Sequence, residues 1–252
     1  GLGTTKVTEH AITPEAGEAL TKTMSDKMAE VLQLIKEGGI RVAVLTETHL
    51  DEDQSSKAVS IIREAGYDAF ALPGSLNVLQ TRRGVIIVWD PNECELDGTL
   101  PEHTNEGDES ACEVVVTDRV SRVRLRLTRD DRAISVYGAY MPVRGDTSDE
   151  LVDTCWDALD EDITYERGQG RTVAIGGDLN AETEEWRQAR RAKNVTRADT
   201  RLMELITDHA LVPQANAATY RTGTQIDNWL VDQELDQHLV RADTLPGVSG
   251  QD

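Results

Sequence analysis

The segment "GGDLNAE", residues 176–182, ends an apolar stretch with two polar side chains, Asp178 and Asn180, one residue apart. If the strand continues through both, their side chains point to the same side of the sheet. Burying a carboxylate at the end of an apolar strand costs free energy unless the carboxylate is paired or bound to a metal ion. The segment therefore indicates a site that contains an acid and an amide.

Three further apolar stretches end on or contain polar side chains that could join this site. They contribute Glu47, Tyr140 and Asp227. The carboxylates of Glu47, Asp178 and Asp227 would repel one another if they met, and a divalent cation would relieve that repulsion. Because all the candidate ligands carry oxygen and none is His or Cys, the pattern favours Mg²⁺. Each residue also has a structural interpretation. Asp178 and Asn180 could form a strand-end turn that caps a following helix, and Glu47 could be a surface strand terminus. Tyr140 could be a packed aromatic whose hydroxyl is satisfied, and Asp227 the partner of an arginine.

Hydrophobic periodicity predicts the elements that would position these side chains. It predicts helices over residues 25–39, 55–66, 148–168 and 200–212. It predicts strands over residues 40–47, 70–74, 83–90, 111–118, 121–130, 133–142, 171–180 and 225–232. The strands at 111–118 and 121–130 alternate polar and apolar residues, which predicts half-buried antiparallel strands. Strands that occur both in such runs and interleaved with helices predict an α/β sandwich of two sheets.

Composition limits the possible functions. The 252 residues, 38% of them hydrophobic, are enough for one large core. The 46 acidic and 26 basic residues give a net charge of -20, so the protein as a whole does not attract phosphate. The three cysteines have no metal-ligand spacing and are expected to be free thiols. No apolar run approaches the roughly 20 residues that span a bilayer, so we expect no membrane partner.

Four motifs in order, "LTETHL", "GAYMP", "GGDLNAE" and "QIDNWLV", resemble the endonuclease/exonuclease/phosphatase superfamily. Within it the chain is most similar to the apurinic/apyrimidinic-type endonuclease domains of non-LTR (LINE-type) retrotransposons. The resemblance implies a deoxyribonuclease-I-like fold, a four-layer α/β/β/α sandwich of two packed mixed sheets. It also implies that residues 1–252 form a single domain of this type.

The resemblance assigns a role to each candidate residue in metal-dependent phosphodiester hydrolysis. Glu47 and Asp252 would hold Mg²⁺, with Mn²⁺ as an alternative, and Asp178 would activate water as the general base. The other catalytic residues would be Asn180 and Tyr140, which contact the phosphate or the water, and Asp227, which pairs with a terminal His in the family.

The family pattern is incomplete at both ends of the sequence. Family members carry an Asn shortly before the "GL" with which this chain starts, and they close with Ser-Asp-His, where this chain has Gln251 and Asp252. We therefore expect a domain trimmed at both ends and, as written, lacking the imidazole that would stabilise the phosphate. We expect His209 and His49 to be non-catalytic.

Substrate contacts are expected from Thr219 and from a basic segment that follows the Asp178 strand. That segment contains Arg187, Arg190, Arg191, Lys193 and Arg197. A second group of arginines, at positions 122, 124 and 126, alternates along one strand. We expect these three to form a solvent-exposed face.

Three functions remain open. The first is the DNA-nicking endonuclease domain of a retrotransposon polyprotein, with DNA as partner, a possible downstream reverse transcriptase region, and an intracellular, nuclear site of action. The second is a superfamily phosphatase or phosphodiesterase on a small or lipid phosphate, which the net charge favours. The third is a catalytically decayed binding module.

Overall fold

The computed structural model describes residues 14–77, 80–99, 110–143, 148–189, 191–214 and 227–236. The predicted ligands and contacts Asp252, Thr219 and Arg190 lie outside these residues. Within them, none of the helices is long and apolar enough to cross a membrane.

The chain builds two main sheets. The smaller has the strand order β1 (Val42–Thr46), β5 (Val85–Trp89), β2 (Asp68–Leu72). The larger has the order β11 (Leu211–Pro213), β12 (Asp227–Asp232), β10 (Thr172–Asp178), β9 (Ala133–Tyr140), β8 (Val120–Leu127), β6 (Cys94–Leu96), and β7 (Cys112–Val116) also pairs with β8. A separate ribbon consists of β3 (Ser75–Asn77) and β4 (Gln80–Arg82).

The strand directions differ between the two sheets. The larger sheet is mixed, because β9 and β10 run parallel while their neighbours pair antiparallel. The smaller sheet is antiparallel in its described strands, so the expectation of two mixed sheets is correct for one of them.

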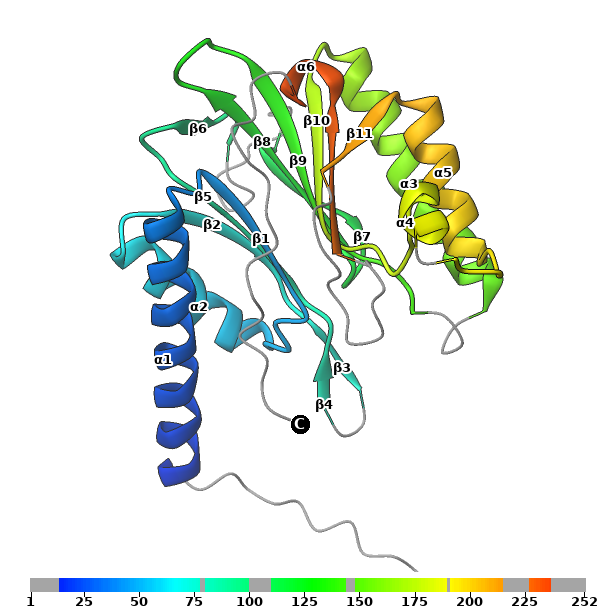
Figure 1. Cartoon of the computed structure of the whole chain (residues 1–252). Helices are drawn as coiled ribbons and strands as arrows, with labels where there is room; N and C mark the ends of the chain where they lie inside the picture. The colour runs from blue at the N-terminus through cyan, green and yellow to red at the C-terminus, as the bar shows by residue number, and fades with distance from the viewer. Residues whose placement is uncertain are drawn as a thin grey trace, which may run out of the picture.

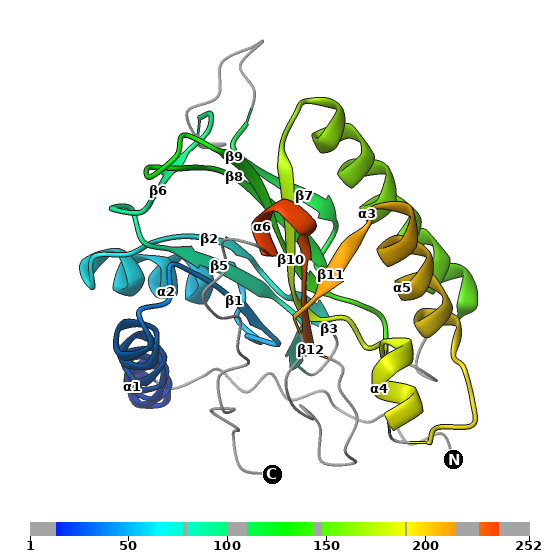
Figure 2. The same ribbon diagram turned by 45° about the horizontal axis from the view of Figure 1, so that its top comes forward.

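Helices cover the outer face of each sheet (Figures 1 and 2). The helices α1 (Pro14–Gly38) and α2 (Glu52–Glu64) lie on the smaller sheet, and α3 (Asp149–Gly168) and α5 (Arg197–Asp208) lie on the larger one. The inner faces of the sheets pack on each other, and one buried cluster joins Ile87 of β5 with Val123 and Val136 of β8 and β9. The predicted four-layer sandwich is thus confirmed. Two short helices, α4 (Glu184–Ala189) and α6 (Gln233–Asp236), complete the described elements.

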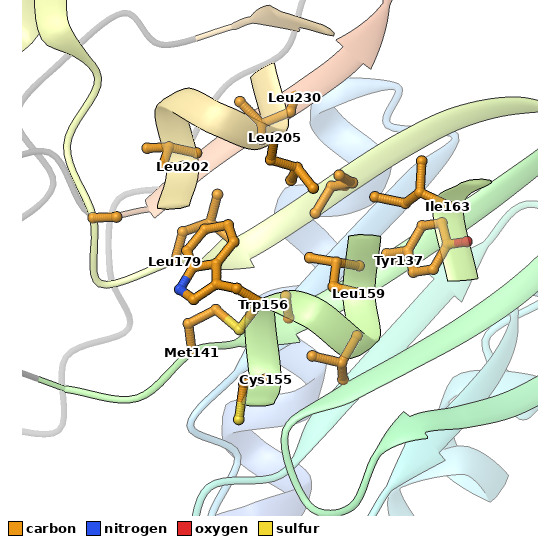
Figure 3. Close-up of a cluster of buried hydrophobic side chains, with 14 of the residues drawn as sticks. Tyr137, Met141, Cys155, Trp156, Leu159, Ile163, Leu179, Leu202, Leu205 and Leu230 are labelled. Atoms are coloured by element: carbon orange, nitrogen blue, oxygen red, sulfur yellow. The ribbon is translucent and has the colours of Figure 1, made fainter. Parts of the chain in front are cut away.

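The largest buried cluster lies between the larger sheet and helices α3 and α5 (Figure 3). Trp156 and Leu159 of α3 pack there with Leu205 of α5. Leu179 and Met141, which directly follow β10 and β9, also belong to this cluster and anchor the ends of both strands. The three cysteines are free and buried, as expected.

The prediction of a half-buried, solvent-facing β8 is wrong. Arg122 and Arg124 are buried because the acidic helix α3 covers this face of the sheet. Arg122 Nη1 donates to Asp162 at 2.6 Å, and Arg124 Nη2 donates to Glu166 Oε1 at 2.6 Å. Only Arg126 of the three is partly exposed, and it pairs with Asp97.

Several predicted boundaries also shift. Helix α1 starts at Pro14 rather than near residue 25, and α2 starts at Glu52 because Asp51 forms a capping box with Gln54. The predicted helix over residues 200–212 divides into α5 and the strand β11, which pairs with β12. The predicted strand over residues 171–180 ends at Asp178.

Candidate active site

Strand register brings the predicted catalytic side chains to one edge of the larger sheet. Tyr140 on β9 is the register partner of Asp178 on β10, and Asp178 is the register partner of Asp227 on β12. Glu47 follows β1 in the other sheet, and Tyr140 Oη donates to its Oε1 at 2.8 Å. The site therefore spans the junction of the two sheets.

The glycine pair before Asp178 allows this close approach. A Cβ on Gly176 would lie 2.8 Å from the indole of Trp229. Gly177 has φ +131°, and a Cβ there would lie 2.1 Å from the carbonyl oxygen of Ala139 and 3.0 Å from Thr46 Cγ2. Only glycine fits both the space and the backbone conformation at position 177, so the local sequence fixes where β10 meets its neighbours.

Asn180 reaches the site through a turn and not through strand alternation. Its φ of +48° lies in the left-handed region, and its backbone N–H donates to Asp178 Oδ1 at 2.9 Å. Its Nδ2 donates to the carbonyl of Met141 at 2.9 Å, while Met141 N–H donates to the carbonyl of Asp178 at 2.8 Å. The expected strand alternation is therefore wrong, but the two side chains do meet, because the turn folds Asn180 back onto Asp178.

Negative charge concentrates at this edge. Burial, followed by the charges of Asp227 and Glu47, raises the pKa of Asp178 to about 8, although hydrogen bonds from Asn180 act in the opposite direction. Burial and the hydrogen bond to Glu47 likewise raise the pKa of Tyr140, so its phenol keeps its proton at neutral pH. The site thus offers a carboxylate that accepts a proton readily and a protonated phenol that can donate a hydrogen bond.

Helix α5 holds the loop after Asp178 through a residue that the sequence analysis missed, Asp199. Its buried carboxylate accepts from the backbone N–H groups of Glu182 and Thr196, both at 2.8 Å. Thr196 and Asp199 also form a capping box at the start of α5. The spacing of these two residues was a readable capping signal, but their link to Glu182 depends on the tertiary fold.

The structure distinguishes among the predicted substrate-binding residues. Arg197 donates to both carboxylate oxygens of Asp153, at 2.7 and 3.0 Å, and Arg187 Nε lies 3.9 Å from Asp199 Oδ2. These two arginines therefore face structural carboxylates. Arg191 and Lys193 are exposed to solvent.

Neither His209 nor His49 takes part in the hydrogen bonds described for the site. The Nε2 of His209, a buried residue at the C-terminus of α5, lies 2.6 Å from Asp160 Oδ1. His49 is exposed and has φ +53°.

Within the part of the chain that the structure describes, no three His, Cys, Asp or Glu side chains form a ready metal-binding group. Glu47 is the exposed carboxylate of the site. Mg²⁺ commonly binds through one or two carboxylates and keeps several waters, so this oxygen-only donor set fits that ion without a closed protein cage.

Neither a protein-family model nor a curated protein matches the sequence. Solved structures do match. The AP endonuclease LMAP from Leishmania major superposes with a TM-score of 0.62 at 14% identity, covering 88% of this chain and 78% of that chain. The endonuclease domain of TRAS1, a telomere-specific non-LTR retrotransposon, gives 0.51 at 16% identity, covering 83% and 81%. The mannosyl-6-phosphatase Bt3783 from Bacteroides thetaiotaomicron gives 0.54 at 12% identity, covering 83% and 78%.

These similarities define the class of fold. The chain has the deoxyribonuclease-I-like fold of endonuclease/exonuclease/phosphatase structures, which include AP endonucleases and a retrotransposon endonuclease domain. The structures with this fold that are named above are nucleases and a phosphatase.

Proposed function

We propose that the protein is a Mg²⁺-dependent phosphodiester hydrolase. The observation that carries the proposal is the convergence of Glu47, Tyr140, Asp178, Asn180 and Asp227 at one junction of two sheets. These residues come from four separate strand ends, so their meeting is a product of the whole fold. They combine an acid, a base and hydrogen-bond donors, as hydrolysis of a phosphodiester requires.

Asp178 is the general base of this proposal. A base works best when its pKa lies near the working pH, and the pKa of Asp178 is about 8. The hydrogen bond from the Asn180 N–H to Oδ1 holds the carboxylate in place. Asp178 would take the proton of the attacking water, and the nearby charge of Asp227 makes it a stronger base.

Tyr140 and Asn180 would act on the phosphate. The phenol of Tyr140 is protonated and would donate to a non-bridging phosphate oxygen once it leaves Glu47. The side-chain amide of Asn180 has a second hydrogen besides the one given to Met141. That hydrogen could orient the water or bind a phosphate oxygen.

Glu47 would hold Mg²⁺, together with Asp252, which lies outside the described residues. The bound ion would supply Lewis-acid stabilisation of charge on the phosphate and the leaving oxygen. Its positive charge would also offset the excess of carboxylates at this edge of the sheet.

The substrate that we propose is DNA, nicked by an endonuclease domain of the retrotransposon type. The motif "LTETHL" and the similarity to the TRAS1 domain support this choice. A linked reverse transcriptase region and nuclear action belong to the same proposal. The second candidate is hydrolysis of a small or lipid phosphate, favoured by the net charge of -20 and by the similarity to a mannosyl-6-phosphatase.

Nicking of supercoiled plasmid tests the proposal. The chain would be assayed with Mg²⁺ and with EDTA, beside a version extended by the family's first-strand Asn and terminal His. Asp178→Asn should lower the nicking rate by about 10³-fold. Asp232→Asn is the matched control, because Asp232 is an equally buried aspartate (8% exposed) at the other end of the β10–β12 pair. Hydrolysis of small phosphate esters with intact plasmid in every lane would instead support the second candidate.

A further inference from the structure

Two arginines and one aspartate lie beside the candidate active site in the loops that support it. Arg83 precedes β5, and its carbonyl accepts from the N–H of His49 at 2.9 Å, in the loop that also carries Glu47. Arg119 precedes β8, and its carbonyl accepts from the N–H of Tyr140 at 2.7 Å. Asp118 stands between them.

The two guanidinium groups share the one carboxylate of Asp118. Arg83 Nη1 lies 2.6 Å from Asp118 Oδ2, and Arg119 Nε lies 3.9 Å from Oδ1. Arg119 Nη1 also donates to the carbonyl of Tyr140 at 3.4 Å. Burial lowers the pKa of Arg119, and the charge of Arg83 lowers it further, because the two cations repel each other. This trio carries a net charge of +1 in a protein whose net charge is -20.

The two arginines differ in how freely they can move. The side chain of Arg119 is 4% exposed and fixed by its backbone contacts, whereas the side chain of Arg83 is 31% exposed. Arg83 is therefore the arginine of the pair that solvent and a ligand can reach. Its φ of +72° is uncommon for a residue with a side chain, and such strain often marks functional positions.

We propose that Arg83 binds a substrate phosphate that flanks the reacting one, and that Asp118 holds it in place until substrate arrives. The inference rests on the proposed function and deepens it, because it makes the substrate a chain of phosphodiesters rather than an isolated phosphate. A guanidinium exchanges readily between a carboxylate and a phosphate, since both accept its paired donors. An acidic protein needs such a local cation to keep a polyanion near Glu47, Asp178 and Asp227.

Binding of a fluorescein-labelled 20-base-pair DNA duplex in EDTA tests this exchange, with anisotropy read across a series of salt concentrations. EDTA keeps the duplex whole and makes the readout independent of hydrolysis. Arg83→Gln should weaken binding about tenfold and lower the slope of log K against log salt by about one phosphate contact. Asp118→Asn should tighten binding severalfold, because it releases Arg83 and removes a negative charge.

The matched control is Arg63→Gln. Arg63 is an exposed arginine of α2 that pairs with Asp68 away from the site, so its loss should leave the salt slope unchanged. The inference is overturned if Arg83→Gln and Arg63→Gln bind alike, or if Asp118→Asn weakens binding as much as Arg83→Gln does. Melting temperatures of the four proteins identify any change that comes from unfolding.

The same variants separate this inference from the proposed function. If neither the parent chain nor any variant nicks DNA, the proposed hydrolysis is contradicted. If the salt slope is nevertheless reduced in Arg83→Gln alone, the phosphate contact of Arg83 is supported. If the parent chain nicks DNA and Arg83→Gln has the same KM, the proposed hydrolysis is supported and the phosphate contact of Arg83 is contradicted.

Discussion

Two clusters of carboxylates, one around buried Glu166 and one around buried Asp178, lie against the same seven-stranded sheet and have opposite electrostatics. Beneath α3, Glu166 and Asp162 face Arg122 and Arg124. At the end of β10, Asp178 faces the carboxylates of Asp227 and Glu47. The comparison shows that burial by itself does not identify a functional acid, and that the neighbouring charges decide its role.

The cluster beneath α3 is electrostatically matched. Burial acts to raise the pKa of Glu166, but hydrogen bonds from Arg124 and Ser135 and the charge of Arg122 outweigh it, so the pKa is lowered. Glu166 is thus ionised and fully paired, which is what a structural ion pair requires. In the site cluster, burial and repulsion act in the same direction, and the pKa of Asp178 rises to about 8.

Replacing the proton-accepting carboxyl group of Asp178 should have the largest effect on activity. We expect Asp178→Asn to lower the nicking rate by about 10³-fold, within the range attributed to a general base. The rate per folded molecule of Asp232→Asn should stay near that of the parent chain. Equal losses in the two variants would mean that the aspartates act through stability, and the proposed contrast between the clusters would fail.

Asp178→Asn should also stabilise the fold at neutral pH. A group whose pKa is raised on folding binds its proton more tightly in the folded protein than in the unfolded chain. Its contribution to stability is fully present below the unfolded pKa and is lost as the pH rises toward the folded pKa. Between about pH 4 and 8 Asp178 is ionised in the unfolded chain but protonated in the folded protein, so folding takes up a proton and stability falls as pH rises, by about 4 kcal/mol at pH 7. Melting temperatures from pH 4 to 8 should show the parent chain falling relative to Asp178→Asn. If the melting temperatures of the two proteins change with pH in parallel, Asp178 is ionised in the folded protein across this range and its pKa is not raised.

Glu166→Gln should do the reverse and destabilise the protein. It leaves Arg122 and Arg124 short of one buried negative charge, and breaking a buried pair costs about 3 kcal/mol. Because the pKa of Glu166 is lowered, its contribution is present above its unfolded pKa and disappears as acid protonates it. Urea unfolding at pH 7 measures the cost, and Glu204→Gln, which touches an exposed ion pair of Arg201, is the control. A loss no larger than the control's would show that the arginines are satisfied without Glu166.

Tyr140→Phe tests the link between the sheets and should have the smallest effect. We expect the nicking rate to fall about tenfold, since one donor to the phosphate is lost. The melting temperature should change little, because Glu47 is exposed and water can replace the phenol. The control is Tyr165→Phe on the exposed face of α3. If the nicking rate of Tyr140→Phe is unchanged, the hydroxyl of Tyr140 has no part in catalysis and the residue serves packing only.

The sequence alone determined the order of the main helices and strands and the polar residues at the strand ends. These are local properties: apolar periodicity defines an element, and Asp178 interrupts an apolar stretch wherever that stretch lies. Recognition of the four motifs then supplied the layer order. Nothing local could show that Asn180 turns back through a left-handed conformation, or that β11 would separate from α5.

Tertiary structure decided which charges are paired. The arginines of β8 alternate in the same way whether water or a helix covers them, so their spacing predicts an exposed face although α3 buries Arg122 and Arg124. Arg83 and Asp118 lie 35 positions apart in the sequence and meet only because the two sheets pack. The energy of a charge depends on its neighbours and on its distance from water, and both are set only when the layers come together.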